Sequence, residues 1–514
     1  MNFKRTYDIR ANLPARIEKV KADILERMRA VKDPIDILLV YPDFRSSNVF
    51  SNPGLPVGLA FIARSLKTAG FEYEVVDLNI DTKEYLMRRI SATNPRFLGI
   101  SMLSYRCKET YELLKAVKYH QPQIKVIAGG PHITANREIT LLECSAIDLG
   151  VIGEGEISIL EIVQGQPVDS IKGLLYREAG TVRFSEEREF IPNLDTVPFP
   201  TYDGFKLAKY SKTMPLHSSR GCPYHCIFCG APGILGKKWR GRSAQSMMEE
   251  VKYWYRKGYR SFYFSDSNFA VDKTRVASFC EGIVKSELHA CFVADGLRAD
   301  HVDRKLLDKM RHAGFTDLTF GVESGSNRIL QNLRKGETRE DIETAIAAAT
   351  DLGFNVGLFF LIGSPGEDET DIDQSFELAR KYNVARVYFF NLTPLPGTQV
   401  YDWAIKHGII DGSERRYPEE NFGFSKKALF RTDVLTKDQI SHHIRVARRV
   451  ERQVQFKYAL TKVLAVTKIK RFFSGENALD SMSWFASNSI VAPVITGLWN
   501  LAVLFKKRLT AHIQ

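Results

Sequence analysis

Three cysteines, Cys222, Cys226 and Cys229, follow one another at a spacing that suits an iron-sulfur cluster. A loop with this spacing can wrap a 4Fe-4S cube and place one thiolate on each of three irons. The fourth iron then has no protein ligand and is open to a substrate or a cofactor. A structural zinc loop or three buried thiols is the alternative. Zinc sites use four ligands and paired motifs, however, and no matching pair follows in this chain.

The composition indicates a multidomain protein of a reducing compartment. A chain of 514 residues is long enough for two or three domains with separate cores. The other cysteines are scattered singly, which argues against a disulfide framework. The first residues, Met-Asn-Phe-Lys-Arg, begin a charged stretch without the apolar core of a signal peptide. We therefore expect a cytoplasmic protein. The scattered cysteines are Cys107, Cys144, Cys280 and Cys291.

Half of the net charge of +12 lies in the last sixty residues. Residues 455–514 carry eight Lys and Arg side chains against two acidic ones, and they flank an apolar stretch at 490–505. This stretch is short and interrupted by Pro493 and Gly497, so it does not predict a membrane span. It predicts either a segment that lies on an anionic membrane surface or a helical hairpin packed on the protein.

The N-terminal third predicts a Rossmann-like α/β domain. A helical apolar stripe at 14–32 falls in an N-terminal extension, residues 1–34. Within 35–165, five apolar runs alternate with four helical patterns, which is typical of a doubly wound parallel sheet. The strands are expected at 37–41, 73–76, 97–101, 124–128 and 149–152, and the helices at 57–69, 83–91, 107–119 and 137–144.

Glycines follow the last two of these strands, at the edge where such sheets bind ligands. The two groups are Gly129-Gly130-Pro131 and Gly153-Glu154-Gly155. Backbone without a β-carbon can approach a large flat ligand or a phosphate closely.

The rest of the chain predicts a linker, a partial barrel and a basic helical tail. Residues 166–212 are proline-rich and irregular. Six strand-helix units follow within 213–425 and indicate a partial (β/α)6 barrel. Residues 426–514 are helical and basic. The barrel strands are expected at 214–219, 260–265, 290–294, 316–321, 355–361 and 385–391, and the helices at 244–257, 271–287, 303–313, 337–353, 368–383 and 398–408.

Polar or glycine-rich residues follow five of the six barrel strands, where active sites of parallel barrels lie. For Asp266, Ser267 and Arg298 a surface turn or an ion pair is the alternative. The candidates are Asp266, Ser267, Arg298, Glu323, Ser324, Ile362 and Gly363.

The cysteine motif, together with the phrases Gly-Val-Glu-Ser-Gly and Ile-Gly-Ser-Pro-Gly-Glu, resembles the radical S-adenosylmethionine (SAM) enzymes. In that family the amino and carboxylate groups of SAM occupy the open iron. The resemblance implies that Phe228 and the backbone of Ile362 and Gly363 contact adenine. It further implies that Arg298 lines the SAM pocket. Glu323 and Ser324 suit the amino and hydroxyl groups of SAM.

Residues 35–165 resemble the cobalamin-binding domain that precedes one large class of radical SAM enzymes. The resemblance rests on the glycine loops and on Pro56, Gly58 and Asp77. The Asp-x-His-x-x-Gly signature is absent, and His132 stands in the wrong context to replace it. We therefore expect base-off cobalamin with no histidine on its lower face. The alternative is a nucleotide-type fold that has lost its cofactor.

The resemblance implies a cobalamin-dependent radical SAM enzyme. Such an enzyme reductively cleaves SAM to a 5'-deoxyadenosyl radical and, in this prediction, transfers a methyl group to an unactivated carbon. It needs a one-electron donor such as flavodoxin or ferredoxin. An oxidative cyclase or rearrangement enzyme and a non-catalytic cobalamin or redox sensor are the alternatives. We expect a small-molecule or lipid substrate, possible peripheral membrane contact through the C-terminal region, and no nucleic acid.

Overall fold

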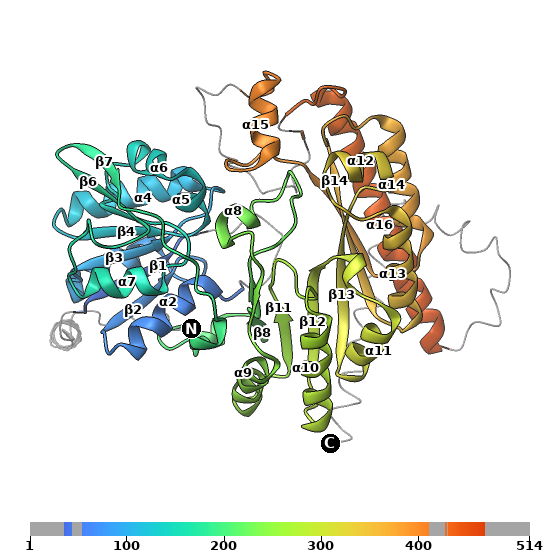
Figure 1. The fold of residues 1–514 in the computed structure, drawn as a ribbon, viewed down its shortest axis with the longest axis horizontal. Helices are drawn as coiled ribbons and strands as arrows, with labels where there is room; N and C mark the ends of the chain where they lie inside the picture. The colour runs from blue at the N-terminus through green and yellow to red at the C-terminus, as the bar shows by residue number, and fades with distance from the viewer. Residues whose placement is uncertain (1–34, 44–53, 411–426, 429, 468–514) are drawn as a thin grey trace, which may run out of the picture.

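A computed structural model describes residues 35–43, 54–410, 427–428 and 430–467. Two α/β domains lie side by side, the N-terminal one in blue and cyan and the C-terminal one in green to orange (Figure 1). The stripe predicted at 14–32 and the apolar stretch at 490–505 lie outside the described residues.

The N-terminal domain is built on a seven-stranded sheet in the order β2-β1-β3-β4-β5-β6-β7. The first five strands are parallel and confirm the predicted doubly wound sheet. Their ends lie within one residue of the predicted ones. The strands are β1 (Ile37–Tyr41), β2 (Tyr73–Asp77), β3 (Phe97–Ser101), β4 (Lys125–Gly129), β5 (Leu149–Val151), β6 (Leu174–Glu178) and β7 (Thr181–Phe184).

Helices cover both faces of this sheet. Alternate residues of a strand point to opposite faces, so Leu38 and Val40 of β1 join one apolar core while Ile37 and Leu39 join the other. Parallel strands buried on both faces have the continuous apolar character seen in these runs. The helices are α2 (Val57–Thr68), α3 (Lys83–Thr93), α4 (Cys107–His120), α5 (Pro131–Asn136), α6 (Glu138–Glu143) and α7 (Glu156–Val163).

The prediction that residues 166–212 form an irregular linker is partly wrong. The strands β6 and β7 form an antiparallel hairpin that extends the sheet beyond β5. Ala179 and Gly180 both have positive φ, 47° and 83°, as a tight hairpin turn requires. Only Leu174 and Leu175 of the hairpin are buried, so its apolar signal is too short to stand out in the sequence. Two 3-10 turns follow, η1 (Leu194–Thr196) and η2 (Leu207–Lys209).

The C-terminal domain contains the predicted six-stranded parallel sheet, in the order β15-β14-β13-β12-β11-β8. The first and last strands in this order are edges, so the barrel is partial, as expected. A short antiparallel pair, β9 (Ser219–Arg220) and β10 (Arg240–Gly241), flanks the cysteine loop. The barrel strands are β8 (Thr213–Leu216), β11 (Ser261–Phe264), β12 (Cys291–Leu297), β13 (Phe315–Glu323), β14 (Asn355–Ile362) and β15 (Arg386–Asn391).

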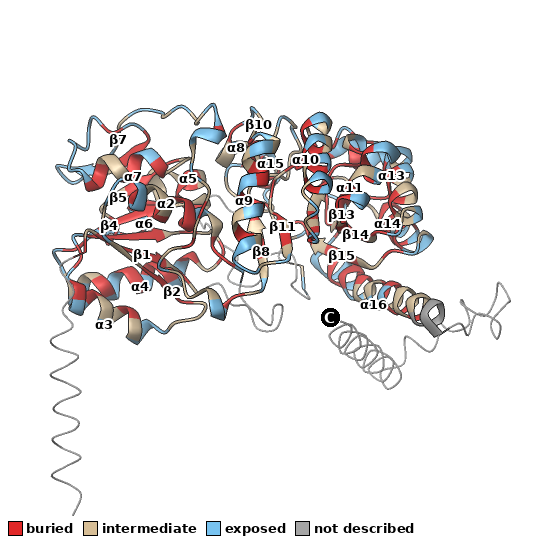
Figure 2. Cartoon of the chain, turned by 90° about the horizontal axis from the view of Figure 1, so that it is seen from below, coloured by how far each residue is buried: buried red, intermediate tan, exposed pale blue. Residues whose placement is uncertain are grey.

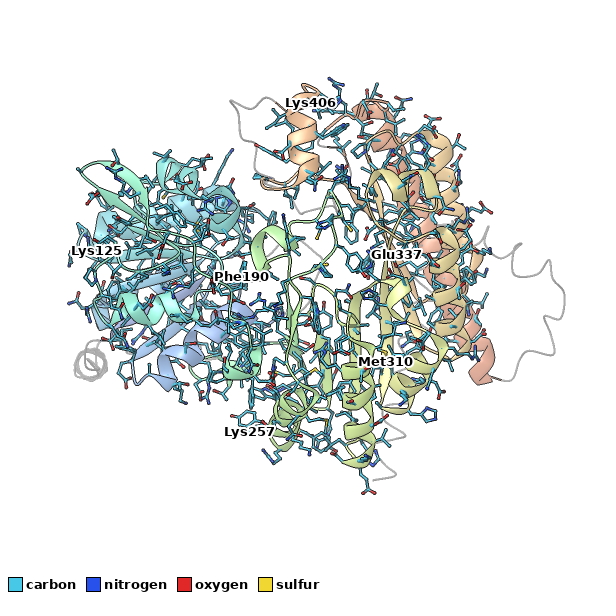
Figure 3. All side chains as sticks on the ribbon, in the orientation of Figure 1. Lys125, Phe190, Lys257, Met310, Glu337 and Lys406 are labelled. Carbon is cyan, nitrogen blue, oxygen red and sulfur yellow. The ribbon has the colours of Figure 1, made fainter. Side chains whose placement is uncertain are left out.

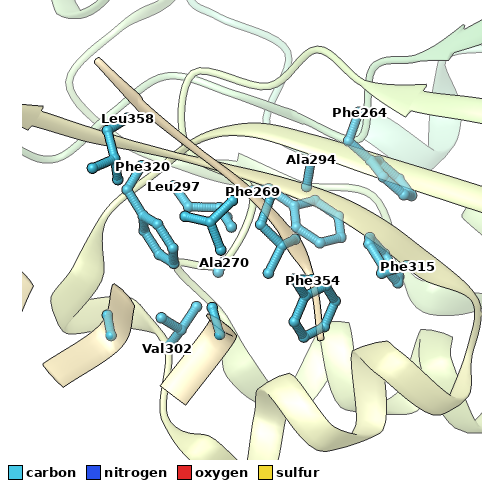
Figure 4. Close-up of a cluster of buried hydrophobic side chains, with 14 of the residues drawn as sticks. Phe264, Phe269, Ala270, Ala294, Leu297, Val302, Phe315, Phe320, Phe354 and Leu358 are labelled. Atoms are coloured by element: carbon cyan, nitrogen blue, oxygen red, sulfur yellow. The ribbon is translucent and has the colours of Figure 1, made fainter. Parts of the chain in front are cut away.

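Helices pack on the outer face of this sheet over an aromatic core. Phe264 and Phe315 stack with ring centroids 5.8 Å apart, and Phe269 packs against both (Figure 4). Buried residues gather on the strands and on the inner helix faces (Figure 2). The helices are α8 (Ala231–Leu235), α9 (Ala244–Arg256), α10 (Lys273–Lys285), η3 (Ala299–His301), α11 (Arg304–His312), α12 (Asn327–Asn332), α13 (Arg339–Asp351), α14 (Glu369–Lys381), α15 (Gln399–Lys406) and α16 (Lys437–Thr467).

The predicted C-terminal helical region begins with α16, which packs along β15 and α14. Buried Ile440, Ile444 and Ala447 join it to the core of the barrel domain. In the part of the chain that the structure describes, no helix has the length and apolarity needed to cross a membrane.

Candidate functional site

The cysteine loop connects β9 to α8 at the carboxyl edge of the barrel sheet. Its first turn needs glycine, because Gly221 has φ of +81° and a β-carbon there would come within 2.3 Å of the Lys238 carbonyl oxygen. The Cys222 amide donates to the Gly236 carbonyl (3.1 Å), and the Cys229 amide donates to the Cys226 carbonyl (3.1 Å). These bonds fix the path of the backbone between the cysteines.

The three thiols are the side chains that the predicted iron-sulfur cluster would use. Among the described residues, no three Cys, His, Asp or Glu side chains gather as ligands of one ion. Each thiolate of an iron-sulfur cube binds a different iron, so the sulfurs need to surround the cube rather than meet. Burial raises the pKa of Cys226 to about 11, while the charges of Lys335 and Arg298 act in the opposite direction. The loop therefore fits the predicted three-thiolate site, whose fourth ligand position is open.

Arg298 contacts the cysteine loop through Tyr224. Its guanidinium lies 3.6 Å from the ring centroid of Tyr224, inside the cysteine motif. It also donates to the Lys335 carbonyl (2.6 Å) and to both carboxylate oxygens of Asp300 (3.0 and 2.8 Å). These contacts make Arg298 a positioning residue for the loop; the predicted contact with SAM stays a prediction.

Glu323 lies beside the cysteines at the end of β13, in strained backbone. It is a non-glycine residue with φ of +68°, a conformation typical of functional sites. Its carboxylate is 3.3 Å from the ammonium group of buried Lys335, which lies equally close to Glu337. The neighbouring Ser324 is fully buried and accepts from the Ser326 amide (3.2 Å), so it stabilises the turn.

The end of β14 presents the predicted backbone site. Phe228 and Leu361 belong to one small apolar cluster, which joins the cysteine loop to this strand. The Gly363 amide donates to Glu367 (2.6 Å), and the Ile362 carbonyl accepts from Leu392 (2.9 Å).

Three buried polar atoms in this corner have no partner among the described residues: Ser364 Oγ, Glu367 Oε1 and Asn391 Nδ2. Buried polar groups are ordinarily paired, so these atoms fit the edge of a polar ligand. The sequence analysis did not select Glu367 or Asn391, although Glu367 ends the Ile-Gly-Ser-Pro-Gly-Glu phrase.

Asp266 positions the strand that enters the cysteine loop. Its buried carboxylate accepts from the hydroxyls of Ser218 (3.0 Å) and Ser219 (2.6 Å), immediately before β9 and at its first residue. The adjacent Ser267 is partly exposed. Asp266 thus ties β11 to the loop, and a contact of either residue with SAM stays a prediction.

A cavity of about 400 Å³ lies between the two domains. Seven of the nine residues predicted to bind cobalamin line it. A β-carbon built on Gly58 or Gly129 meets no atom within 4 Å, so the backbone there borders open space. Leu39, Ile127 and Val151 add an apolar wall. The cavity therefore fits a large, flat, partly apolar group. The seven residues are Gly58, Gly129, Gly130, Pro131, Gly153, Glu154 and Gly155.

The other two predicted residues do not line the cavity. Pro56 is the residue before α2. Asp77 is buried at the end of β2, an edge strand, and accepts from the Tyr210 hydroxyl (2.7 Å) and the Asn79 amide (2.8 Å). Its carboxylate thus holds the connecting segment to the N-terminal domain, and its predicted cobalamin contact stays a prediction.

A buried ion cluster joins the cavity to the cysteine loop. Arg220, two residues before Cys222, pairs with Glu154 (2.9 Å) and Glu156 (2.6 Å) of the N-terminal domain. Arg240 pairs with the same oxygen of Glu154 (2.8 Å) and lies over Phe190, which is at the domain boundary (Figure 3). Sequence reasoning missed both arginines. Both arginines lie far from the glutamates along the chain, so no local sequence pattern indicates that they pair.

The fold and the two sites define an α/β protein that can hold an open iron-sulfur cluster beside a cofactor-sized cavity. Residues 216–379 match the family model "Radical SAM superfamily", and residues 48–163 match the model "B12 binding domain". An uncharacterized methyltransferase of Pyrococcus horikoshii is 31% identical over 387 residues, which cover 73% of this chain and 84% of that protein.

Two further comparisons agree. The cytidylyl-2-hydroxyethylphosphonate methyltransferase of Streptomyces wedmorensis is 26% identical, over 70% of this chain and 80% of that protein. The cobalamin-dependent SAM radical enzyme OxsB, solved with aqua-cobalamin and SAM bound, has the same fold. Its TM-score is 0.70 at 17% identity, covering 90% of this chain and 73% of that chain.

The chain belongs to the radical SAM superfamily, in the group that also carries a B12-binding domain. This confirms the resemblance and the fold class predicted from the sequence.

Proposed function

We propose that the protein is a cobalamin-dependent radical SAM methyltransferase that acts on an unactivated carbon. The observation that carries this proposal is the pair of sites joined by Arg220, a cysteine loop on one side and a glycine-lined cavity on the other. Two cofactors held within reach of one substrate carbon give a reason for the two domains to share a chain.

The cofactors supply the difficult chemistry when bound: reductive cleavage of SAM to a 5'-deoxyadenosyl radical, and transfer of a methyl group. The protein's residues bind and orient. Cys222, Cys226 and Cys229 would hold the cluster, and Glu323 and the Gly363 region would bind SAM. The glycine loops would hold a corrinoid against the N-terminal sheet.

The partners follow from this chemistry. The cluster needs a one-electron donor such as flavodoxin or ferredoxin, and the substrate is a small molecule or a lipid. The basic C-terminal residues support peripheral contact with an anionic membrane, although residues 468–514 lie outside the described part of the chain. The predicted divisions at 34, 212 and 425 belong to the same proposal, with the β6–β7 hairpin assigned to the N-terminal domain.

The first test needs no knowledge of the substrate. The full chain is reconstituted anaerobically with ferrous salt, sulfide and hydroxocobalamin, then given a reductant and SAM. We expect iron, sulfide and corrinoid in the purified protein, and both 5'-deoxyadenosine and S-adenosylhomocysteine among the products. A cyclase would form 5'-deoxyadenosine alone. A loaded and reduced protein that forms neither product would support a sensor and contradict the proposal.

A further inference from the structure

The long helix α16 uses two of its faces to pack on the barrel domain, at whose edge it lies (Figure 2). One face joins the core of the domain. A second face lies beside α14, where Gln439 donates to Glu369 (3.4 Å) and Lys457 donates to the Arg380 carbonyl (3.5 Å). The face between these two contacts is exposed and is available to a partner.

This exposed face carries a row of three arginines, Arg445, Arg449 and Arg452. Their spacing of four and three residues places them above one another along the helix, over roughly 10 Å. None of the three side chains has a hydrogen bond or an ion pair to a described residue. The nearby carboxylate of Glu451 is bound instead to Arg448 and to a backbone amide of β15. The charge of this arginine row is therefore not neutralised within the described part of the chain.

The sequence that follows α16 adds both positive charge and apolar side chains. Residues 468–514 carry six Lys and Arg side chains against two acidic ones, and the stretch 490–505 within them has no charged side chain. Binding to a bilayer becomes firm when attraction to anionic lipids and burial of apolar side chains act together, because either one alone is weak. The arginine row and the sequence after it supply these two contributions.

Anionic lipid suits the arginine row better than nucleic acid does. Proteins that bind single strands stack the bases on aromatic rings that lie among the cations. The next aromatic side chains along α16 are turned inward, since Phe456 is buried and the Tyr458 hydroxyl donates to Asn355. We propose that the arginine row of α16 docks on the anionic headgroups of a membrane surface. The inference rests on the membrane contact in the proposed function and assigns that contact to α16.

The experiment measures flotation of the full chain with vesicles of phosphatidylglycerol and phosphatidylcholine, and with vesicles of phosphatidylcholine alone. We expect binding to the anionic vesicles only, and weaker binding as the NaCl concentration rises. The triple change Arg445→Gln, Arg449→Gln and Arg452→Gln should lower the partition coefficient roughly a hundredfold, because each arginine at an anionic surface contributes about fivefold. Lysine at the same three positions keeps the charge and should keep most of the binding.

The matched control removes the same charge from exposed positions on and directly after α9, by Lys252→Gln, Arg256→Gln and Lys257→Gln, and should bind like the wild type. Unchanged binding of the α16 glutamine variant, or tighter binding of duplex DNA than of anionic vesicles, would overturn the inference.

If the α16 glutamine variant does not fold, wild-type binding that is insensitive to NaCl overturns the inference equally. A wild-type chain that does not float with anionic vesicles overturns it too, and removes the membrane contact from the proposed function. The radical chemistry is tested separately, because formation of 5'-deoxyadenosine is measured without vesicles.

Discussion

The cysteine loop and the interdomain cavity are built in opposite ways. The loop is surrounded by charge and hydrogen bonds: Arg298 stacks on its tyrosine, and Lys335 lies between Glu323 and Glu337. The cavity is bounded mostly by glycine backbone and aliphatic side chains, and the paired Glu154, Glu156 and Arg220 also line it. A cluster of fixed size with a polar ligand calls for preorganised charges, whereas a large flat ring calls for shape and desolvation. The Arg220 ion cluster lies between the cysteine loop and the cavity.

The largest expected effect is the loss of the cluster from the cysteine loop while the cavity keeps its corrinoid. In Cys226→Ser one iron loses its thiolate, so we expect loss of most of the iron and no detectable 5'-deoxyadenosine, with corrinoid retention unchanged. Iron, sulfide and corrinoid assays on the same preparation measure this. Cys291→Ser, at an exposed cysteine outside the motif, is the matched control and should retain all three. Full turnover in Cys226→Ser would disprove the cluster assignment.

Removing the connection between the regions should cost stability. Arg220→Met leaves Glu156 buried without its arginine, and breaking a buried ion pair in this way costs about 3–5 kcal/mol. We expect a lower urea midpoint and weaker corrinoid retention in the cofactor-free chain. Arg304→Met breaks an exposed pair with Asp351 and should change the midpoint little. Equal midpoints for the two variants would refute a structural role for the ion cluster.

Filling the cavity should weaken corrinoid binding and leave the iron content unchanged. Gly129 has room for a β-carbon, and a leucine there should project into the space that the ring needs. Overpacking of about 1–3 kcal/mol corresponds to a loss of corrinoid affinity of roughly 5- to 140-fold. Gly129→Ala should lose less, and both variants should keep their iron. Equilibrium dialysis with hydroxocobalamin checks this order; equal affinity in Gly129→Leu and wild type would place the ring elsewhere.

The smallest expected effect is on the pH dependence of stability, through Glu367, whose carboxylate accepts from the Gly363 amide. Burial raises the pKa of Glu367 from 4.5 to about 8 in the folded protein. Between these values the unfolded state releases the proton while the folded state keeps it, so this group's contribution to stability falls as pH rises. Glu367→Gln resembles the protonated form and should flatten that fall. Urea midpoints measured across this pH range test it; a steeper fall in the variant would contradict the assignment.

Local sequence patterns were sufficient to predict most of the helices and strands of this protein. The predicted strands and helices of both domains agree with the structure because each parallel strand is a short, continuous apolar run between amphipathic helices. The β6–β7 hairpin was missed because it is short and mostly exposed. The helix expected at 137–144 is α6, and the short helix α5 before it was missed; Arg137, whose φ is +52°, divides the two.

The sequence alone determined the cysteine spacing and the glycines at the strand ends. It also determined the strand-helix alternation that makes the first five strands of one sheet and all six of the other parallel, since each of these features depends on residues close together in the chain. The tertiary structure alone decided that Asp77 holds the connecting segment, that Arg220 joins two glutamates of the other domain, and that the arginine row of α16 stays exposed. These outcomes depend on how distant segments pack, and burial changes what a charged or titratable side chain can do there.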